Sequence, residues 1–497
     1  MKRIGLIGWL LLGWLLLGAA IGAMAQPSPE ALQRTLDELA GREPLKGAAW
    51  GACIQKMDGT VIAARQGGMR LTPASNLKLI TTGSALHAFG ADYRFETRVG
   101  YTGRIEEGTL KGDVYLIGGG DPTIGVKDSI ALKPDALFWK WKSQLKGAGI
   151  QRVEGRILGD GRAWEGGKEN TSWTYDDIGT YYGAGSDALS FYENAVDFYV
   201  SATEEGKPVR IQQIYPETPW MTIENQTMTG PAGTGNSLFL FTTDLSKSGA
   251  WRGSFAVGRK PKTEHAANKY GALTCAYYFW KYLKNTGFEV SGGYGVPDTD
   301  EAPSRPGNER AATGGPLTLV GKTLSPPLSD IVRFTNWRSD NFYAESLFRL
   351  MGEKASGIAV YDSCRVAEAE VLESLGLDPS SVRLEDGSGL SRRSAVSPAF
   401  FCDFLRAMQG SPAAGAFLGS LPALGKGTLR TLLPNHPSCS RIRLKSGSME
   451  GILCYSGYLL DESGVPVAVF SLMTGGTTAP TGEVRSALAR ILTLLLE

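Results

Sequence analysis

A serine and a lysine three residues apart, Ser75 and Lys78, begin the apolar stretch ASNLKLITTGSAL. Residues at positions i and i+3 share one face of a helix, so this spacing brings the hydroxyl and the amine together. A lysine amine is protonated in water, but burial lowers its pKa and leaves a neutral amine that can take a proton. The pair therefore predicts a serine nucleophile that is activated by a lysine base.

Histidine, the usual base for a catalytic serine, is scarce, and the chain has only His87, His265 and His436. His87 lies about 18 Å beyond Ser75 along the expected helix, which is too far to accept the proton of the hydroxyl. The other two histidines have no supporting motif, and no cluster of metal-ligating residues is visible. We therefore expect no metal and no cofactor.

Neither Ser-x-x-Lys nor Lys-Ser-Gly is specific by itself. Ser143 and Lys146 also fit the first pattern, within the amphipathic segment WKWKSQLKGAG. The second pattern occurs at residues 247–249 and again at 445–447. Each pattern alone more often marks an exposed charge beside a turn, so only the combination of motifs carries weight.

A third motif completes the combination. Ser339-Asp340-Asn341 is the one Ser-x-Asn in the chain and stands in a loop before the helix-like run NFYAESLFRL. Ser75 opens an apolar helix, where the positive end of the helix dipole favours developing oxyanion charge. Lys445 ends the strand-like run RIRLK. In this order the three motifs resemble the signature of serine β-lactamases and penicillin-binding proteins.

Longer stretches resemble the class C penicillin-binding proteins, which are D-alanyl-D-alanine carboxypeptidases that also act as endopeptidases. These stretches are PASNLKLIT, YLIGGGDPT, YYGAGSDALSFYENA, SDNFYAESLFR, DGSGLSR and RLKSGSMEGILCYSGYL. The interval of 261 residues from Lys78 to Ser339 also resembles this class, whose members carry extra domains there. The resemblance implies a serine peptidase that cleaves peptidoglycan stem peptides through an acyl-enzyme and that β-lactams acylate.

The resemblance also implies a role for each motif residue. Ser75 is the acylated nucleophile, and Lys78 is its base. Ser339 relays a proton to the leaving amine, while Asn341 orients Lys78 and the peptide of the substrate. Lys445 holds the terminal carboxylate of the substrate.

The last motif departs from the Lys-Thr-Gly-Thr that is usual in the family, because here it reads Lys445-Ser446-Gly447-Ser448. Serine keeps the hydroxyl and loses a methyl group, so the chemistry survives while rotamer freedom rises. By resemblance, these four residues bind the substrate. The backbone N–H groups of Ser75 and Ser448 would form the oxyanion hole.

Two other interpretations stay open. A β-lactamase or esterase would use the same scaffold, although a β-lactamase needs a base for its deacylating water, which no motif supplies. A catalytically silent wall-binding relative is the second, although such a protein would be free to lose one of the motif residues. The stretch DGSGLSR, residues 386–392, contains good turn formers, which favours a structural role.

The motifs require the two ends of the chain to fold together. A helix-like leucine repeat in residues 28–42 precedes two strand-like runs joined at Asp58-Gly59, a strong hairpin signal. Three strand-like runs and a helix-like segment close the chain. The economical prediction is one α/β domain assembled from both termini.

The middle of the chain has many short strand-like runs separated by Gly- and Asp-rich turns. We expect an α/β fold of the serine β-lactamase and penicillin-binding-protein type, with an antiparallel sheet flanked by helices and a large, mainly β insertion of one or two small domains. The predicted division is a signal peptide at 1–25, a transpeptidase-like catalytic domain at 26–94 plus 315–497, and inserted β domains at 95–314.

The first 25 residues combine Lys2 and Arg3 with an apolar run and the exit Ala23-Met24-Ala25, which is typical of a cleaved signal peptide. An uncleaved anchor is the alternative, because the run approaches the ~20 residues that span a bilayer. We expect an exported protein of the periplasm or cell envelope, and peripheral contact with a membrane stays open.

Charge and cysteine usage exclude other classes. The chain has 51 Lys and Arg against 50 Asp and Glu, without a run of like charge, so it has no electrostatic signature of nucleic-acid binding. Its six cysteines include no Cys-x-x-Cys, so zinc-type spacing is absent. Disulfides and buried free thiols are both compatible with their spacing.

Overall fold

The computed structural model describes residues 28–126, 129–164, 166–297 and 316–497. The predicted signal peptide therefore lies outside the described residues. Within those ranges, no helix is both long and apolar enough to cross a membrane. The six cysteines all fall inside the ranges, and each is a free thiol.

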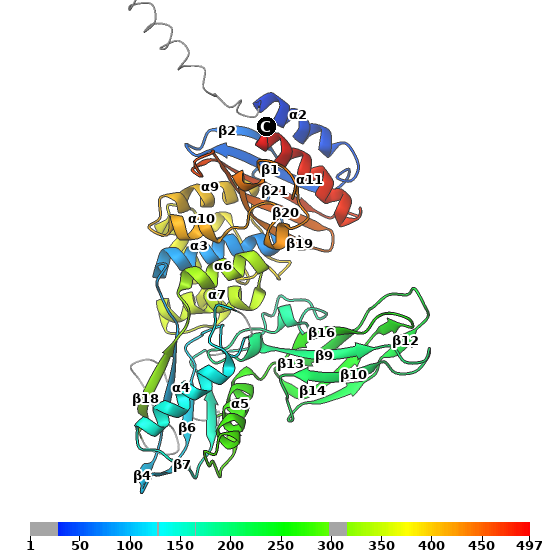
Figure 1. Ribbon diagram of the computed structural model, residues 1–497. Coiled ribbons are helices and arrows are strands. Elements are labelled where there is room, and N and C mark those ends of the chain that lie inside the picture. The colour runs from blue at the N-terminus through cyan, green and yellow to red at the C-terminus, as the bar shows by residue number, and fades with distance from the viewer. Residues whose placement is uncertain (1–27, 127–128, 165, 298–315) are drawn as a thin grey trace, which may run out of the picture.

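A five-stranded antiparallel sheet contains strands from both ends of the chain (Figure 1). In spatial order its strands are β19 (Ile442–Met449), β20 (Ile452–Leu460), β21 (Pro466–Gly475), β1 (Ala49–Lys56) and β2 (Val61–Arg65). The hairpin expected at Asp58-Gly59 joins β1 to β2. The pairing of β1 with β21 runs from Ala49 opposite Gly475 to Lys56 opposite Ala468, so the first and last strands are neighbours.

Helices cover both faces of this sheet, because successive residues of a strand point to opposite sides. Ile54 of β1 packs in one core with the leucines of α2 (Pro29–Ala40) and α11 (Thr481–Leu496). The preceding residue, Cys53, belongs to the other core, which contains the remaining helices of this half. Its helices are α3 (Lys78–Phe89), α6 (Leu328–Arg338), α7 (Asn341–Ser356), α8 (Tyr361–Ser374), α9 (Pro398–Gln409) and α10 (Ala414–Ser420).

The interval between α3 and α6 builds a second sheet with two helices. In spatial order its strands are β17 (Tyr294–Gly295), β8 (Ile157–Asp160), β6 (Val114–Ile117), β3 (Glu96–Tyr101) and β18 (Thr318–Leu324). The helices α4 (Pro134–Gly147) and α5 (Gly271–Asn285) share its core, where the rings of Trp141 and Phe279 meet edge to face at 5.4 Å. A small sheet of β4 (Arg104–Glu106), β5 (Thr109–Lys111) and β7 (Arg152–Val153) adjoins it.

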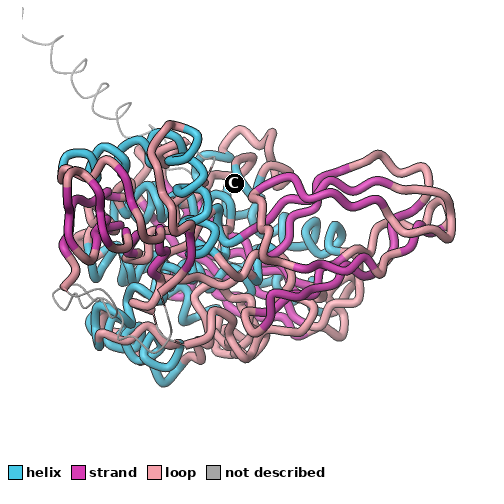
Figure 2. The backbone as a smooth tube through the Cα atoms, turned by 90° about the horizontal axis from the view of Figure 1, so that it is seen from below, coloured by secondary structure: helices cyan, strands magenta, loops and turns pink. Residues whose placement is uncertain are grey.

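The remaining strands form an elongated arm that projects from the second sheet (Figures 1 and 2). They are β9 (Ala195–Ser201), β10 (Arg210–Tyr215), β11 (Thr222–Asn225), β12 (Met228–Gly230), β13 (Phe239–Thr243), β14 (Ser246–Arg252), β15 (Ser254–Ala256) and β16 (Lys262–Ala267). Phe198 and Trp251 fill its core, with ring centroids 5.1 Å apart.

The chain enters and leaves this large insertion at one point. Phe95 and Ser325 exchange two hydrogen bonds: the Ser325 N–H donates to the Phe95 carbonyl at 3.0 Å, and the Phe95 N–H donates to Ser325 Oγ at 3.0 Å. Next to this contact, β3 and β18 pair in antiparallel fashion. The two ends of the insertion therefore lie side by side.

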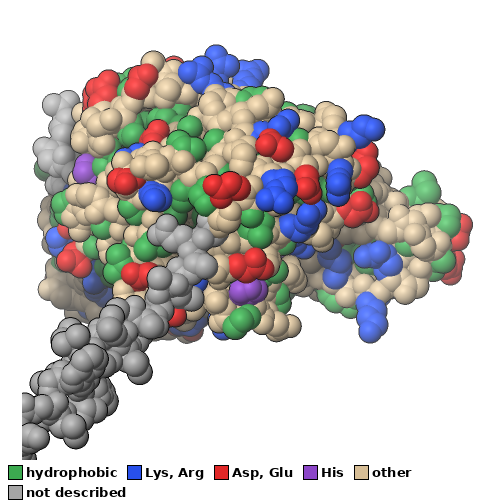
Figure 3. Space-filling model, turned by 90° about the horizontal axis from the view of Figure 1, so that it is seen from above, with side chains coloured by type: hydrophobic (Ala, Val, Ile, Leu, Met, Phe, Trp, Pro, Cys, Tyr) green, Lys and Arg blue, Asp and Glu red, His purple; other side chains and the backbone are tan. Residues whose placement is uncertain are grey.

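The architecture confirms the predicted fold class, an antiparallel sheet flanked by helices with a large insertion rich in β structure. Because β18 pairs with β3, the strands of the insertion continue to Leu324, and the division at residues 94 and 314 stays a prediction. Seen from above, basic and acidic side chains intermingle over the surface, in keeping with the balanced composition (Figure 3).

Candidate active site

Ser75 lies on the 3-10 turn Ala74–Leu77, which leads directly into α3. The turn places the Ser75 hydroxyl beside Lys78, the first residue of the helix, and Lys78 Nζ donates to Ser75 Oγ at 3.0 Å. Ser75 is half-buried, whereas Lys78 is fully buried. The amine and the hydroxyl therefore meet where water has little access to the amine.

Three oxygen atoms surround the Lys78 amine. Besides Ser75 Oγ, they are Asn341 Oδ1 at 2.6 Å and the Ser388 carbonyl at 2.7 Å. Burial lowers the pKa of Lys78 to about 8, and the negative charges of Asp386, Asp340 and Glu345 oppose this shift. A substantial fraction of the amine is therefore neutral near pH 8, as a general base requires.

Ser339, Asp340 and Asn341 form the junction between α6 and α7. Ser339 ends α6 in the left-handed region, at φ 60°. Asp340 caps α7, because its side chain accepts from the Tyr343 N–H at 3.1 Å. Asn341 is the first residue of α7, so the change of direction between the helices aims its side chain at Lys78.

Lys445 lies in the middle of β19 rather than at its end, because Ser446 to Met449 stay paired with β20. Its Nζ donates to Ser339 Oγ at 2.8 Å and to the Ser446 carbonyl at 2.6 Å. Burial, and secondly the nearby Lys78, hold the pKa of Lys445 well below its usual value. An anion bound beside it would favour its charged form.

The residues after Lys445 line the same region. Ser446 Oγ donates to Thr428 Oγ1 at 3.1 Å, and Ser448 is exposed. Gly447 lies against the turn of the nucleophile: a Cβ atom there would be 2.6 Å from the Pro73 carbonyl oxygen. Only glycine lets β19 approach the turn this closely.

The stretch 386–391 also reaches the centre. Its Ser388 carbonyl accepts from Lys78, while the Ser388 N–H donates to the buried Glu345 at 2.8 Å. Asp386 accepts from the N–H groups of Gly389 and Ser391 at 2.9 and 2.7 Å and so fixes the loop. Sequence reasoning expected only a structural role here. It missed the contact with Lys78 because that contact is made by the backbone.

A cavity of about 390 Å³ opens beside these groups. The catalytic half contributes Ser339 and Asn341 to its lining, and the insertion contributes Tyr181 and Tyr182. The Tyr182 carbonyl accepts from Asn341 Nδ2 at 3.0 Å, so the insertion contacts the centre directly. This contact too was not predicted from the sequence.

The competing motifs lie elsewhere. Ser143 is inside α4 and donates to the Trp139 carbonyl at 2.8 Å, and Lys247 is on β14 in the arm. His265 contacts Asp197 at 2.7 Å, again in the arm. Of the candidate motifs, those at Ser75, Ser339 and Lys445 meet in one place.

The sequence is similar to known proteins over most of its length. The family model described as "D-Ala-D-Ala carboxypeptidase 3 (S13) family" matches residues 32–495. A D-alanyl-D-alanine carboxypeptidase of Actinomadura sp. (strain R39) is 28% identical over 469 residues, covering 90% of this chain and 82% of that protein. The carboxypeptidase DacB of Haemophilus influenzae is 23% identical over 437 residues, with 86% and 85% covered.

Solved structures show the same fold. Penicillin-binding protein 4 of Haemophilus influenzae superposes with a TM-score of 0.77 at 20% identity, over 94% of this chain and 99% of that one. The same protein complexed with a β-lactam gives a TM-score of 0.73 at 20% identity, over 95% of this chain and 99% of that one.

Proposed function

The chain belongs to the D-Ala-D-Ala carboxypeptidase 3 (S13) family, and we propose that its motif residues carry out the reaction as follows. It is a serine peptidase that acts on peptidoglycan, as the resemblance of its motifs predicted. The observation that carries the proposal is the buried Lys78 amine, which lies 3.0 Å from Ser75 Oγ and 2.6 Å from Asn341 Oδ1.

In the proposed acylation step, neutral Lys78 takes the proton of Ser75 while Oγ attacks the carbonyl carbon between the two D-alanines. The N–H groups of Ser75 and Ser448 stabilise the oxyanion that forms. When the intermediate collapses, the C–N bond breaks and Ser339 relays the proton from Lys78 to the departing amine, which leaves Lys78 neutral again. A water molecule then hydrolyses the ester, with Lys78 again as the base.

Residues of β19 bind the substrate. The Lys445 ammonium attracts the terminal carboxylate of the peptide, and the hydroxyls of Ser446 and Ser448 donate hydrogen bonds to it. A β-lactam presents a carboxylate and a reactive carbonyl in a similar arrangement, so it enters the same position and acylates Ser75. Gly447 keeps this strand close to the nucleophile.

We also propose that the protein works outside the cytoplasm, in the periplasm or cell envelope, after removal of residues 1–25. Support comes from the signal-like composition of that segment and from the location of peptidoglycan. If the segment is retained instead, it attaches the enzyme to the membrane. Mass measurement of the protein isolated from its host distinguishes the two forms.

Covalent labelling tests the proposed function. The purified protein is incubated with fluorescent penicillin and, separately, with a pentapeptide ending in D-Ala-D-Ala. The expected results are a penicilloyl adduct on Ser75, slow turnover of the antibiotic and release of D-alanine. Rapid turnover would instead favour a β-lactamase, and labelling without peptide cleavage would favour a silent relative.

Two serine variants identify the nucleophile. Ser75→Ala is expected to abolish both the adduct and the release of D-alanine, because among the described residues only the Ser75 hydroxyl contacts the Lys78 amine. Ser143→Ala is the matched control, since it stands in the same Ser-x-x-Lys pattern within α4. Equal losses in the two variants would contradict the assignment.

A further inference from the structure

The segment from Tyr182 to Ser186 is held by side chains at five consecutive carbonyl groups. Asn341 Nδ2 donates to the Tyr182 carbonyl at 3.0 Å, and Arg349 Nη1 donates to the Ser186 carbonyl at 2.8 Å. Lys269 Nζ donates to the Gly183 and Ala184 carbonyls at 2.7 and 3.2 Å, and Asn194 Nδ2 donates to the Gly185 carbonyl at 3.0 Å. Such dense anchoring fixes the position of this backbone relative to α7.

The anchors come from two parts of the molecule. Asn341 and Arg349 both belong to α7, in the catalytic half. Lys269 follows β16 and precedes α5, in the insertion. The segment therefore connects α7, which carries the Asn341 amide, with a lysine of the insertion.

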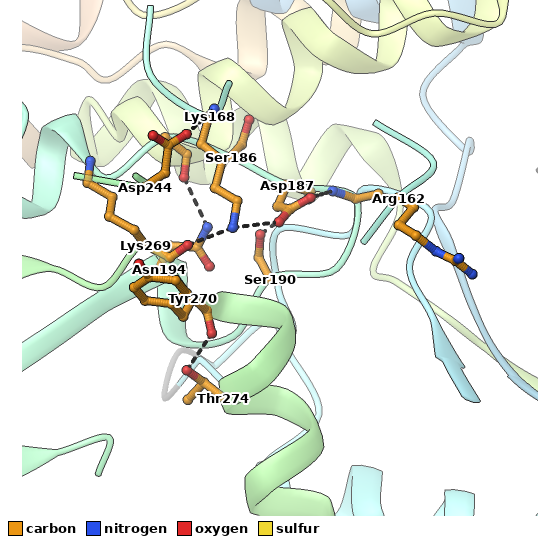
Figure 4. Close-up of polar contacts among 12 residues, drawn as sticks. Arg162, Lys168, Ser186, Asp187, Ser190, Asn194, Asp244, Lys269, Tyr270 and Thr274 are labelled. Atoms are coloured by element: carbon orange, nitrogen blue, oxygen red, sulfur yellow. Dashed lines mark hydrogen bonds and ion pairs between the residues drawn. The ribbon is translucent and has the colours of Figure 1, made fainter. Parts of the chain in front are cut away.

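Lys269 itself is rigidly placed. Its side chain is fully buried, and its Nζ lies 2.8 Å from Glu169 Oε1. Lys168 Nζ donates to the Lys269 carbonyl at 2.6 Å and forms an ion pair with Asp187 Oδ2 at 2.9 Å. Figure 4 shows the Lys168 ammonium between Asp187 and the backbone of Lys269. A buried ammonium with this many partners gives the segment little freedom to move.

The consequence concerns the orientation of one amide. A carbonyl can only accept hydrogen bonds, so the Tyr182 carbonyl requires Nδ2 of Asn341 to face it. The other end of the amide, Oδ1, is then left to accept from Lys78. If Tyr182 moved away, the amide would be free to turn and present a donor to the lysine.

We infer that Lys269 is a positioning residue for catalysis, because it holds the Tyr182–Ala184 backbone where it orients the Asn341 amide toward Lys78. Lys269 does not touch the substrate or the reacting atoms. The inference rests on the roles proposed above for Lys78 and Asn341. It adds a contribution from the insertion that the three motifs do not contain.

The test measures the rate of Ser75 acylation by fluorescent penicillin. Lys269→Met removes the ammonium and is expected to slow acylation about 10- to 100-fold, the usual effect of misplacing a catalytic group by a fraction of an ångström to 1 Å. The double variant Lys269→Met/Glu169→Gln also removes the carboxylate that would otherwise be left unpaired. The double variant is expected to melt near the wild-type temperature and to be acylated as slowly as Lys269→Met.

Lys281→Met is the matched control. Lys281 lies on α5 and has an ion pair of the same length, 2.8 Å to Glu217, but it has no contact with the Tyr182–Ser186 segment. It is expected to keep the wild-type acylation rate. A general effect of losing a lysine from the insertion would slow both variants and would contradict the inference.

A double-mutant cycle separates positioning from general destabilisation. In an Asn341→Ala background, Lys269→Met is expected to change the acylation rate less than twofold, because the amide that it orients is absent. Additive losses, wild-type acylation by Lys269→Met, or unfolding of both Lys269 variants would each overturn the inference. Failure of the wild-type protein to be acylated would instead overturn the proposed function.

Discussion

Lys445 Nζ lies 2.8 Å from Ser339 Oγ, so the lysine of β19 and the serine between α6 and α7 share a hydrogen bond across the active site. The second acceptor of Lys445, the Ser446 carbonyl, is also a neutral oxygen. Burial disfavours the charged form of Lys445, and an anion bound beside it would favour the ammonium. The carboxylate of the substrate would supply that charge beside Ser339, where the departing amine must be protonated.

The first prediction concerns this hydrogen bond. Ser339→Ala is expected to lower kcat/KM for a D-Ala-D-Ala peptide by about 10²- to 10⁴-fold, the usual worth of a positioned proton donor. Steady-state release of D-alanine measures it. Ser356→Ala, at the other end of α7, is the control and is expected to keep full activity. Unchanged hydrolysis by Ser339→Ala would contradict a role in proton transfer.

The second prediction concerns pH. Burial lowers the pKa of Lys78 to about 8, and only the neutral amine can take the proton of Ser75. Acylation by a β-lactam is therefore expected to rise about tenfold per pH unit below 8 and to level off above it. Stopped-flow or gel-based acylation rates between pH 5.5 and about 9 measure the profile. A flat profile over this range would exclude Lys78 as the base.

The third prediction concerns Glu345. Burial raises the pKa of its carboxyl group to about 7. Its negative charge, after those of Asp386 and Asp340, raises the pKa of Lys78, so Glu345→Gln is expected to shift the midpoint of the acylation profile to lower pH. Glutamine keeps an oxygen for the Ser388 N–H.

Glu368 provides the control for this shift. It is another fully buried carboxyl group and lies on α8. Burial raises its pKa to about 7 as well. It has no contact with the active-site lysines, so Glu368→Gln is expected to leave the midpoint where it is. A shift in both variants, or in neither, would show that Glu345 has no specific effect on Lys78.

The fourth prediction concerns Gly447. In Gly447→Ala the added Cβ would lie 2.6 Å from the Pro73 carbonyl oxygen and 2.8 Å from the Asn76 nitrogen. We expect a loss of stability of about 1–3 kcal/mol and displacement of the turn that carries Ser75, with acylation at least about tenfold slower. Gly482→Ala, which has open space around it, is the control for melting temperature and rate. Wild-type acylation by Gly447→Ala would contradict the close packing.

The motif residues could be singled out from the sequence because each combines a reactive side chain with a legible local context. Ser75 precedes an apolar helix, and Ser339 stands between two helices. Lys445 belongs to a strand, although the strand continues to Met449 and does not end at Lys445 as predicted. Pairing with β20 decides that boundary, since tertiary contacts override local preference in strands.

The backbone contacts of the site could not be predicted in the same way. The Ser388 and Tyr182 carbonyls touch Lys78 and Asn341, but every residue type offers a carbonyl, so no residue pattern marks them. Lys269 was missed for a related reason. It lies in a part of the chain with no motif, and its importance depends on which backbone segment the fold brings beside it.

The hydrogen bonds between Phe95 and Ser325 have an evolutionary consequence. Because the insertion begins and ends at neighbouring backbone atoms, it could be gained or exchanged in one recombination event without disrupting the surrounding helices. Its Tyr182 carbonyl nevertheless reaches the amide next to the catalytic lysine. Any replacement insertion would therefore need to place a backbone hydrogen-bond acceptor at the position of the Tyr182 carbonyl.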